Sequence, residues 1–273
     1  MSEFTMPAGT CDTHMHIYGP RDKYAEAPTS PFPPPNAPLP AYREIMTLLG
    51  IERCVIVQPA SYGKDNSCTL DAIAEMDGRA RGIAVVDTET SDAEMRRLTD
   101  AGFRGARLHM FGGQVFEWDE LEGVANRVQD FDWHVQIQFN GREMPERAAL
   151  IERFPGTVVI DHVGKFMDPV PPDHEAFQTM LRLVDRGNVW VKLSAVYEVS
   201  LDGPPNYADT GALARELVKR APERMLWASN WPHPSVTDKP DEIVLRDAIL
   251  SWMGDDATRR RILVDNPAEL YGF

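Results

Sequence analysis

The feature that most constrains the fold of this chain is an eightfold alternation between short apolar runs and amphipathic stretches. Each apolar run has the length and the valine and isoleucine content of a strand that is buried on both faces. The runs cover residues 10–17, 54–60, 82–87, 105–110, 134–139, 157–163, 189–195 and 225–230. Eight strand–helix units in succession favour a closed ring of parallel strands over an open sheet.

The amphipathic stretches between the runs predict the helices of an α/β fold. They cover residues 41–49, 69–76, 93–101, 121–129, 145–154, 174–185, 211–220 and 242–253. Ser91 and Glu94 have the spacing of a capping box before the third stretch, and Gly50, Gly78 and Gly102 stand where helices should end. We therefore predict one (β/α)8 TIM barrel domain over residues 1–273. No glycine-rich phosphate loop follows the first run, which argues against a dinucleotide-binding sheet.

Composition narrows the class of protein. The hydrophobic content of 43% and the charged content of 26% are those of a soluble globular protein, and no apolar run approaches the ~20 residues of a membrane helix. Residues 1–9 lack the pattern of a secretory signal, so we expect a cytoplasmic location and reduced thiols at Cys11, Cys54 and Cys68. The net charge of −14 argues against nucleic-acid and anionic-membrane partners.

A proline-dense segment, residues 28–40, follows the first run. Proline fixes φ and lacks an amide hydrogen, so this segment should form an extended surface loop. Its length suggests a flap over the mouth of the barrel rather than a linker between domains.

Candidate functional residues stand at the ends of the runs, because the active site of a TIM barrel lies at the carboxyl ends of its strands. His14 and His16 end the first run two positions apart, so both side chains should point to the same side. His162 ends the sixth run, and Asn230 ends the eighth. Two histidines at this spacing are harder to dismiss as packing than one alone.

Other polar residues near the same ends are candidates for substrate binding. They are Ser61 and Tyr62 after the second run, Arg107 and His109 in the fourth, and Gln138 in the fifth. Gln136, Lys192 and Ser194 also lie in predicted strands, without an assigned role.

These residues give the chain a resemblance to the amidohydrolase superfamily. The motif Asp-x-His-x-His at 12–16, the strand-end His162 and the triplet Trp-Pro-His at 231–233 carry it. Segments 55–58, 69–74, 81–87 and 160–162 are also similar to the branch that contains the 2-pyrone-4,6-dicarboxylate lactonases. The resemblance covers nearly the whole chain, and it implies a small carboxylated lactone as substrate.

The chain departs from the metal-dependent members of this family in its middle strands. These members use a lysine or glutamate there, together with an aspartate on the eighth strand. A catalytic zinc site needs three protein ligands, and that minimum would be met by His14, His16 and His162. Since no bridging anion accompanies them and the lactonase branch works without metal, we expect no metal and no other cofactor.

The second departure is Asn230, which stands where the family has an aspartate that activates water. Asparagine takes no proton at neutral pH, so hydrolysis should be crippled. The resemblance then favours the lactone isomerases of this branch, which convert D-galactaro-1,5-lactone to the 1,4-lactone in galacturonate catabolism. The carbon-4 hydroxyl is a tethered nucleophile, and no activated water is needed.

For that reaction we assign carbonyl polarisation to His14, His16 and His162 as a group, one of them with a pKa near neutral acting as proton shuttle. Asn230 would orient the substrate or bind the leaving oxygen. Arg107 should bind the free carboxylate, with Ser61 and Tyr62 as weaker candidates.

Three alternatives stay open at this stage. A lactone hydrolase would need another base, such as His162 or Asp161, unless the chain is an engineered Asp→Asn variant. A metal-dependent hydrolase would hold stoichiometric zinc. A protein that only binds lactones or acid sugars would have little need of three histidines.

Overall fold

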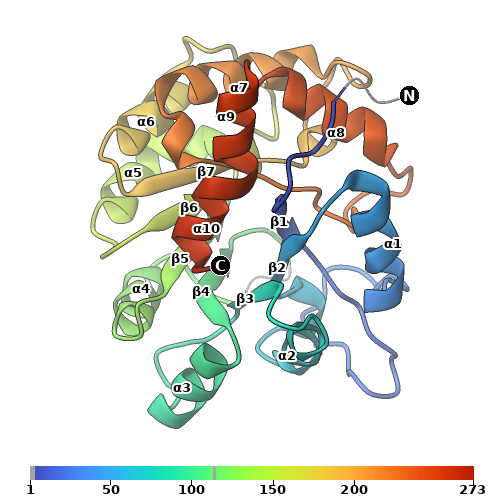
Figure 1. The fold of residues 1–273 in the computed structure, drawn as a ribbon. Coiled ribbons are helices and arrows are strands. Elements are labelled where there is room, and N and C mark those ends of the chain that lie inside the picture. Colours follow the sequence, from blue (N-terminus) through green and yellow to red (C-terminus); the bar gives the residue numbers. More distant parts are fainter. Residues whose placement is uncertain (1–3, 113–114) are drawn as a thin grey trace.

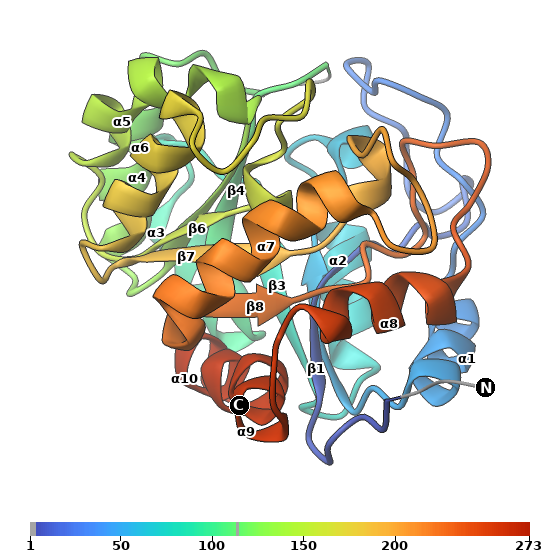
Figure 2. The same ribbon diagram turned by 90° about the horizontal axis from the view of Figure 1, so that it is seen from above.

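The computed structural model describes residues 4–112 and 115–273. Its parallel strands form one sheet in the order of the sequence, from β1 to β8, as a barrel that the helices surround (Figures 1 and 2). The strands are β1 (Cys11–Met15), β2 (Arg53–Val57), β3 (Ala80–Ala84), β4 (Phe103–His109), β5 (His134–Gln138), β6 (Val158–Ile160), β7 (Val189–Leu193) and β8 (Met225–Trp227). The predicted fold class is confirmed.

A helix follows each strand and covers the outside of the barrel. These helices are α1 (Leu39–Leu49), α2 (Ser67–Ala74), α3 (Asp92–Asp100), α4 (Leu121–Gln129), α5 (Met144–Ile151), α6 (Glu175–Val184), α7 (Ala208–Arg220) and α8 (Glu242–Ser251). The Ser91 hydroxyl accepts a hydrogen bond from the Glu94 amide at 3.2 Å, as the predicted cap requires. Gly50 ends α1 in the left-handed conformation.

The amino-terminal end of the barrel is filled with apolar side chains. Cys11, Val55, Ile83, Val159 and Leu226 come from strands around the ring and form one buried cluster with Tyr271. Tyr271 belongs to α10 (Asn266–Tyr271), which follows α9 (Asp256–Arg260). Figure 1 shows α10 near the centre of the ring, so the chain's last helix closes this end of the barrel.

The seam between β8 and β1 is closed around the buried carboxylate of Asp12. This carboxylate accepts hydrogen bonds from the Ser229 amide at 3.0 Å and the Tyr42 hydroxyl at 2.9 Å, and from the Ser229 hydroxyl. The backbone amide of Asn230 donates to the His14 carbonyl at 2.9 Å. The aspartate of the Asp-x-His-x-His motif therefore joins the first strand to the residues that follow the last one.

All eight strands end one to three residues before the ends of their predicted apolar runs, and β6 and β8 are among those that end three residues early. β6 ends at Ile160 and β8 at Trp227, and each is followed by a sharp bend. His162 and Asn230 have φ of 57° and 60°, the left-handed region that asparagine tolerates better than most residues. These bends turn the two side chains out of the strand directions toward the middle of the barrel mouth.

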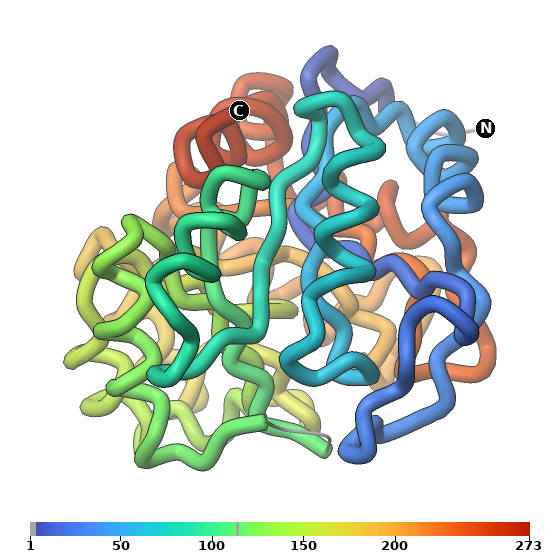
Figure 3. Tube along the Cα trace, turned by 90° about the horizontal axis from the view of Figure 1, so that it is seen from below, coloured from blue at the N-terminus to red at the C-terminus, as the bar shows by residue number. Residues whose placement is uncertain are grey.

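The proline-rich segment runs past the carboxyl ends of the strands as an irregular loop and ends where α1 begins at Leu39. Figures 2 and 3 place it at the same end of the molecule as the loop after β4. Phe32 of this segment lines the cavity described below.

Two further expectations concern the cysteines and the membrane. Cys11, Cys54 and Cys68 are buried and free of disulfides. Within residues 4–112 and 115–273, every helix falls short of the length and apolar character needed to cross a bilayer.

Gly141 offers a test of how closely the turns at the mouth pack. A Cβ at this position would lie 2.4 Å from the backbone oxygen of Gly164, in the turn that carries His162. Backbone cannot move aside as a flexible side chain can, so Gly141→Ala should lower the free energy of unfolding by about 2 kcal/mol. Urea denaturation followed by circular dichroism measures this.

Gly112→Ala is the matched control, because its Cβ would meet only Pro31, at 3.9 Å. It should change the free energy of unfolding by less than about 0.5 kcal/mol. Equal stability of the two variants would contradict the close packing of the two turns.

Candidate active site

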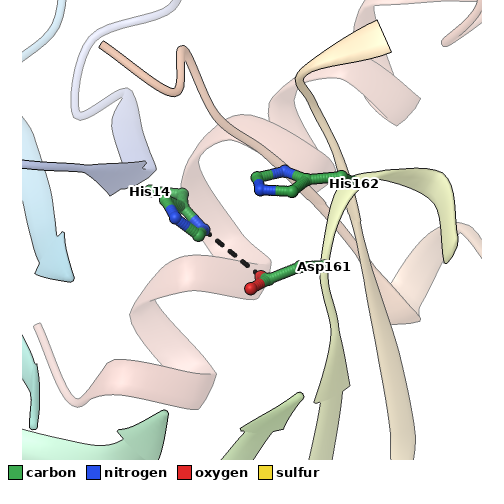
Figure 4. Close-up of side chains that lie close together, drawn as sticks. All are labelled: His14, Asp161 and His162. Carbon is green, nitrogen blue, oxygen red and sulfur yellow. Dashed lines mark hydrogen bonds and ion pairs between the residues drawn. The ribbon is translucent and has the colours of Figure 1, made fainter. Parts of the chain in front are cut away.

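Three histidines from distant parts of the sequence meet at the carboxyl ends of the strands. The ring centroid of His14 lies 4.9 Å from that of His16 and 4.7 Å from that of His162. All three side chains are buried. Figure 4 shows the rings of His14 and His162 close together, with Asp161 beside His14. The structure thus brings together the histidines that the sequence pattern singled out.

Hydrogen bonds decide which ring nitrogens carry a proton. The Nδ1 atom of His16 lies 2.8 Å from the Val57 carbonyl oxygen, which can only accept, so Nδ1–H donates and Nε2 keeps a lone pair. The shortest contact of His14 Nδ1 is 3.2 Å, to the carboxylate of Asp161, so the same assignment follows. Among the described residues, His14 Nε2 has no hydrogen-bond partner. His14 and His16 therefore present acceptors, where the sequence analysis expected donors.

His162 differs from the other two. Its Nδ1 lies 2.8 Å from the hydroxyl of Ser194, which can donate as well as accept. If the hydroxyl donates, the Nε2 atom of His162 carries the proton. His162 is therefore the one of the three histidines whose partner allows it to present an Nε2–H donor.

The three histidines are neutral at physiological pH. Burial and, next, the charge of Arg107 lower the pKa of His16 to about 3. Burial and the charge of Lys192 lower the pKa of His14, and burial followed by His14 lowers that of His162. The expected histidine with a pKa near neutral is thus absent from this trio. Any proton that one of them takes up is held only transiently.

A buried polar network lies beneath the histidines. The ammonium of Lys192 donates to the Gln136 amide oxygen at 2.6 Å and to the Thr13 carbonyl at 2.8 Å, and lies 3.7 Å from Asp161. The Gln136 amide donates to Asp161 at 3.1 Å. Burial lowers the pKa of Lys192 to about 8, so the ammonium persists at neutral pH. This network fixes the position and protonation of His14.

A cavity opens above the histidines and measures about 400 Å³ including its open mouth. Its polar lining residues are His16, Tyr18, Arg107, His109, Gln138, His162, Lys165, Glu198, Asn230 and Ser235. The predicted binding residues Arg107, His109 and Gln138 therefore share one cavity with three of the four predicted catalytic residues. His14 forms the layer directly below, in ring contact with His16 and His162.

Arg107 is a buried cation with no counter-ion in residues 4–112 and 115–273. Its side chain donates to the Gln58 carbonyl at 2.9 Å and to the Gln138 amide oxygen at 3.0 Å, and it lies 3.5 Å from His109 Nδ1. Its Nε has no partner among the described residues, and none of their carboxylates lies within ion-pair distance. A desolvated guanidinium in this state favours an anionic ligand.

Asn230 is held in one orientation by its side-chain amide. Its Nδ2 donates to the Tyr197 hydroxyl at 2.8 Å and to the Glu198 carboxylate at 3.3 Å. The Tyr197 hydroxyl in turn lies 2.9 Å from His233 Nδ1, and His233 Nε2 lies 2.8 Å from Glu242. Since a carboxylate only accepts, Asn230 must place its amide nitrogen there, and its Oδ1 is left as the acceptor for a ligand.

Lys165 and Glu198 form an ion pair at the cavity that the sequence analysis did not assign to the site. Their side chains are 10% and 7% exposed, and Glu198 also accepts from the Ser235 hydroxyl. Lys165 directly follows the predicted strand-end motif, so its position offered a signal. Tyr197 and Glu198 lie in the short helical turn Val196–Glu198 after β7, and nothing in their local sequence distinguishes them.

Ser61 and Tyr62 are not brought to the cavity. Both lie in the turn Ala60–Tyr62, and neither is among the lining residues. The Tyr62 hydroxyl accepts from the Gly19 amide at 3.1 Å, and its ring packs against Tyr18 and Tyr24. Tyr18, which was not among the predicted residues, lines the cavity instead, and its ring lies 6.3 Å from that of His16.

Two contacts oppose a divalent metal ion held by His14 Nδ1, Asp161 and His162. His14, Asp161 and His162 have ligand atoms within 4.8 Å of one another. However, His14 Nδ1–H already donates to Asp161, so these two facing atoms cannot both bind one ion. The ammonium of Lys192 also lies 3.4 Å from His14 Nδ1 and would repel a second cation. Protein groups already supply the positive charge at this place.

Comparison with known proteins gives consistent matches along the chain. The profile of the amidohydrolase family matches residues 11–273. The chain is 38% identical to D-galactarolactone isomerase from Agrobacterium fabrum, over 97% of this chain and 91% of that protein. It is 35% identical to the 2-pyrone-4,6-dicarboxylate hydrolase of Comamonas testosteroni, over 98% and 92%. A crystal structure of an Agrobacterium tumefaciens protein without ligand superposes with a TM-score of 0.94, at 37% identity, over 100% of this chain and 99% of that one.

Metal titration tests the assignment of Lys192 in the network. Chelator-treated protein should bind no stoichiometric Zn²⁺ in isothermal titration calorimetry, because Lys192 supplies the positive charge. Lys192→Met removes that charge and should allow binding of about one ion per chain. Tight stoichiometric binding by the unaltered protein would contradict this account of the site.

Proposed function

Because the chain belongs to the amidohydrolase family, we propose that it is a lactone isomerase that converts D-galactaro-1,5-lactone to D-galactaro-1,4-lactone. The observation that carries the proposal is Asn230, which lines the cavity at the end of β8 with its amide nitrogen bound to Tyr197 and Glu198. An amide oxygen orients a hydroxyl but does not remove a proton from water. The similarity to D-galactarolactone isomerase over 97% of the chain supports the same reaction.

Arg107 binds the free carboxylate of the substrate in this proposal. The residue is 5% exposed; Nη1 keeps an N–H beyond the one given to Gln58, Nε–H has no partner among the described residues, and the second N–H of Nη2 faces His109 Nδ1 at 3.5 Å. The planar fork suits a carboxylate, which would also relieve the cost of a buried unpaired charge. His109 and Gln138 border the same subsite and help to hold the guanidinium.

The reaction is an intramolecular acyl transfer. The carbon-4 hydroxyl loses its proton as its oxygen attacks carbon 1, and the carbonyl electrons move onto the carbonyl oxygen. The tetrahedral intermediate then collapses, the bond from carbon 1 to the carbon-5 oxygen breaks, and that oxygen takes up a proton. No water is consumed. A tethered nucleophile reaches effective molarities of ~10⁵ M or more when it is well oriented.

His16 is the group that moves the proton. Its Nε2 lone pair is fixed by the bond from Nδ1–H to Val57, and its side chain lines the cavity. Arg107 is the second cause of its low pKa, and a carboxylate bound to Arg107 would oppose that influence. Since the attacking oxygen loses a proton and the leaving oxygen gains one, a single base that returns its proton is sufficient.

His162 polarises the carbonyl. Ser194 allows its Nε2 to carry a hydrogen, so it can donate to the oxygen that becomes negative in the intermediate. One such donor contributes ~3 kcal/mol to the stability of a transition state. His14, held by Asp161, contacts both rings and lines the layer behind them. The proposal includes a metal-independent reaction in the cytoplasm, within the breakdown of galacturonate that the family resemblance implies.

A lactone hydrolase is the second candidate, favoured by one observation. Glu198 is a carboxylate at the same cavity, 3.3 Å from the amide of Asn230, and could serve as a base for water. The 2-pyrone-4,6-dicarboxylate hydrolase with 35% identity belongs to that class. Glu198 is already engaged by Lys165 and Ser235, so its oxygen atoms are less available to a water molecule than those of a free carboxylate.

Proton NMR distinguishes these candidates. Chelator-treated protein mixed with D-galactaro-1,5-lactone should accumulate the 1,4-lactone without the open diacid, faster than the spontaneous reaction. Diacid as the main enzymatic product would establish the hydrolase, and an unchanged spectrum would overturn both candidate functions.

Arg107→Gln should lower kcat/KM at least ~100-fold, because a charge-assisted bidentate pair is lost.

Asn230→Asp tests the meaning of the asparagine. A carboxylate at this position can take a proton from water, so diacid formation should rise roughly 100-fold. The same NMR assay measures the ratio of diacid to 1,4-lactone. Asn188→Asp is the control, because it makes the same change where the side chain only donates to Gly156 at the far end of β7. No gain in hydrolysis by Asn230→Asp would count against our explanation.

A further inference from the structure

The cavity is lined by ionisable side chains whose charges do not cancel. Among the described lining residues, Arg107 and Lys165 are cations and Glu198 is an anion. The histidines that line the cavity are neutral, because burial and neighbouring cations lower the pKa of each. The lining therefore carries a net charge of +1.

The two cations are not equivalent. Arg107 has no carboxylate partner among the described residues, whereas Lys165 donates directly to Glu198. Below the lining, Lys192 and Asp161 lie 3.7 Å apart and largely cancel each other. One cation thus remains free to bind an anionic group, and the second is already neutralised.

Glu198 is held firmly in this neutralising position. Its side chain is 7% exposed and accepts from Lys165, from Ser235 and, at 3.3 Å, from the amide of Asn230. Donors on two different loops, those after β6 and β8, fix it, so it does not swing away to release Lys165. A second carboxylate on a ligand would meet Glu198 across the cavity, and like charges this close repel.

We propose that Glu198 determines the charge of the ligand that the site accepts, limiting it to lactones with a single carboxylate. Arg107 binds that carboxylate, and the Lys165–Glu198 pair excludes a second one. The inference rests on the proposed function, in that the cavity binds a carboxylated lactone. D-Galactaro-1,5-lactone carries one free carboxylate, whereas 2-pyrone-4,6-dicarboxylate carries two.

A series of charge variants tests the proposal with two pyrone ligands. 2-Pyrone-5-carboxylate carries one charge and 2-pyrone-4,6-dicarboxylate carries two, on the same ring. Isothermal titration calorimetry gives the Kd of each, and selectivity is the Kd of the monoanion divided by that of the dianion. Binding is measured without turnover, so the result does not depend on whether the isomerisation is observed.

Selectivity for the dianion should follow the net charge of the lining. Glu198→Gln raises that charge to +2 and should increase selectivity at least ~10-fold, since an amide keeps the shape of the side chain without its charge. Lys165→Gln lowers the charge to zero and should decrease selectivity by a similar factor. The double variant Lys165→Gln, Glu198→Gln restores +1 and should return selectivity to within ~3-fold of the unaltered protein.

One surface variant serves as the control for the measured selectivity. Glu94→Gln removes one charge from an exposed pair with Arg97 on α3 and should leave selectivity unchanged. Unchanged selectivity in both single variants with native circular dichroism, or a double variant that keeps the gain of Glu198→Gln, would overturn the role of Glu198. If the unaltered protein bound neither pyrone, the proposed carboxylated-lactone site itself would be overturned.

Discussion

The carboxylate of Asp161 accepts hydrogen bonds from His14 on β1 and from Gln136 on β5, with the ammonium of Lys192 on β7 at 3.7 Å. These groups are fully buried and come from opposite sides of the barrel. A buried charge is tolerated only when partners replace the lost water, so each member requires the others. This network sets the tautomer of His14 and places the ammonium of Lys192 3.4 Å from that ring, and the functional cavity lies directly above it.

Above this layer, function depends on which charges have partners. Arg107 has no counter-ion in the described part of the chain and favours a carboxylate, whereas Lys165 is paired with Glu198. The same Glu198 accepts a hydrogen bond from the amide nitrogen of Asn230. The residue that neutralises Lys165 therefore also orients Asn230, so that its amide oxygen is available to the ligand. Water activation and the binding of a second anion are thus both opposed by one small group of contacts. An intramolecular acyl transfer is the chemistry that needs neither.

Much of this organisation could be predicted from the sequence. The eight apolar runs give the strands in order, and the residues at their ends include His14, His16, His162, Arg107 and Asn230. The sequence did not predict which ring nitrogens carry a proton. Val57 and Asp161 accept hydrogen bonds from the Nδ1 atoms of His16 and His14, so these two rings present acceptors at Nε2 instead of the expected donors. Ser61 and Tyr62, the weaker candidates for substrate binding, do not line the cavity, because the turn after β2 directs Tyr62 toward Tyr18 and Tyr24.

The sequence by itself determined the barrel, the set of strand-end histidines and the amide at position 230, because hydrophobic period and residue chemistry are local properties. Only the tertiary structure decided the protonation of each ring, the isolation of Arg107 and the pairing of Lys165 with Glu198. These depend on distances between residues far apart in the chain: His14 and Asp161 are separated by 147 positions and Lys165 and Glu198 by 33. Electrostatic interactions act through space, and a pattern along the chain does not contain those distances.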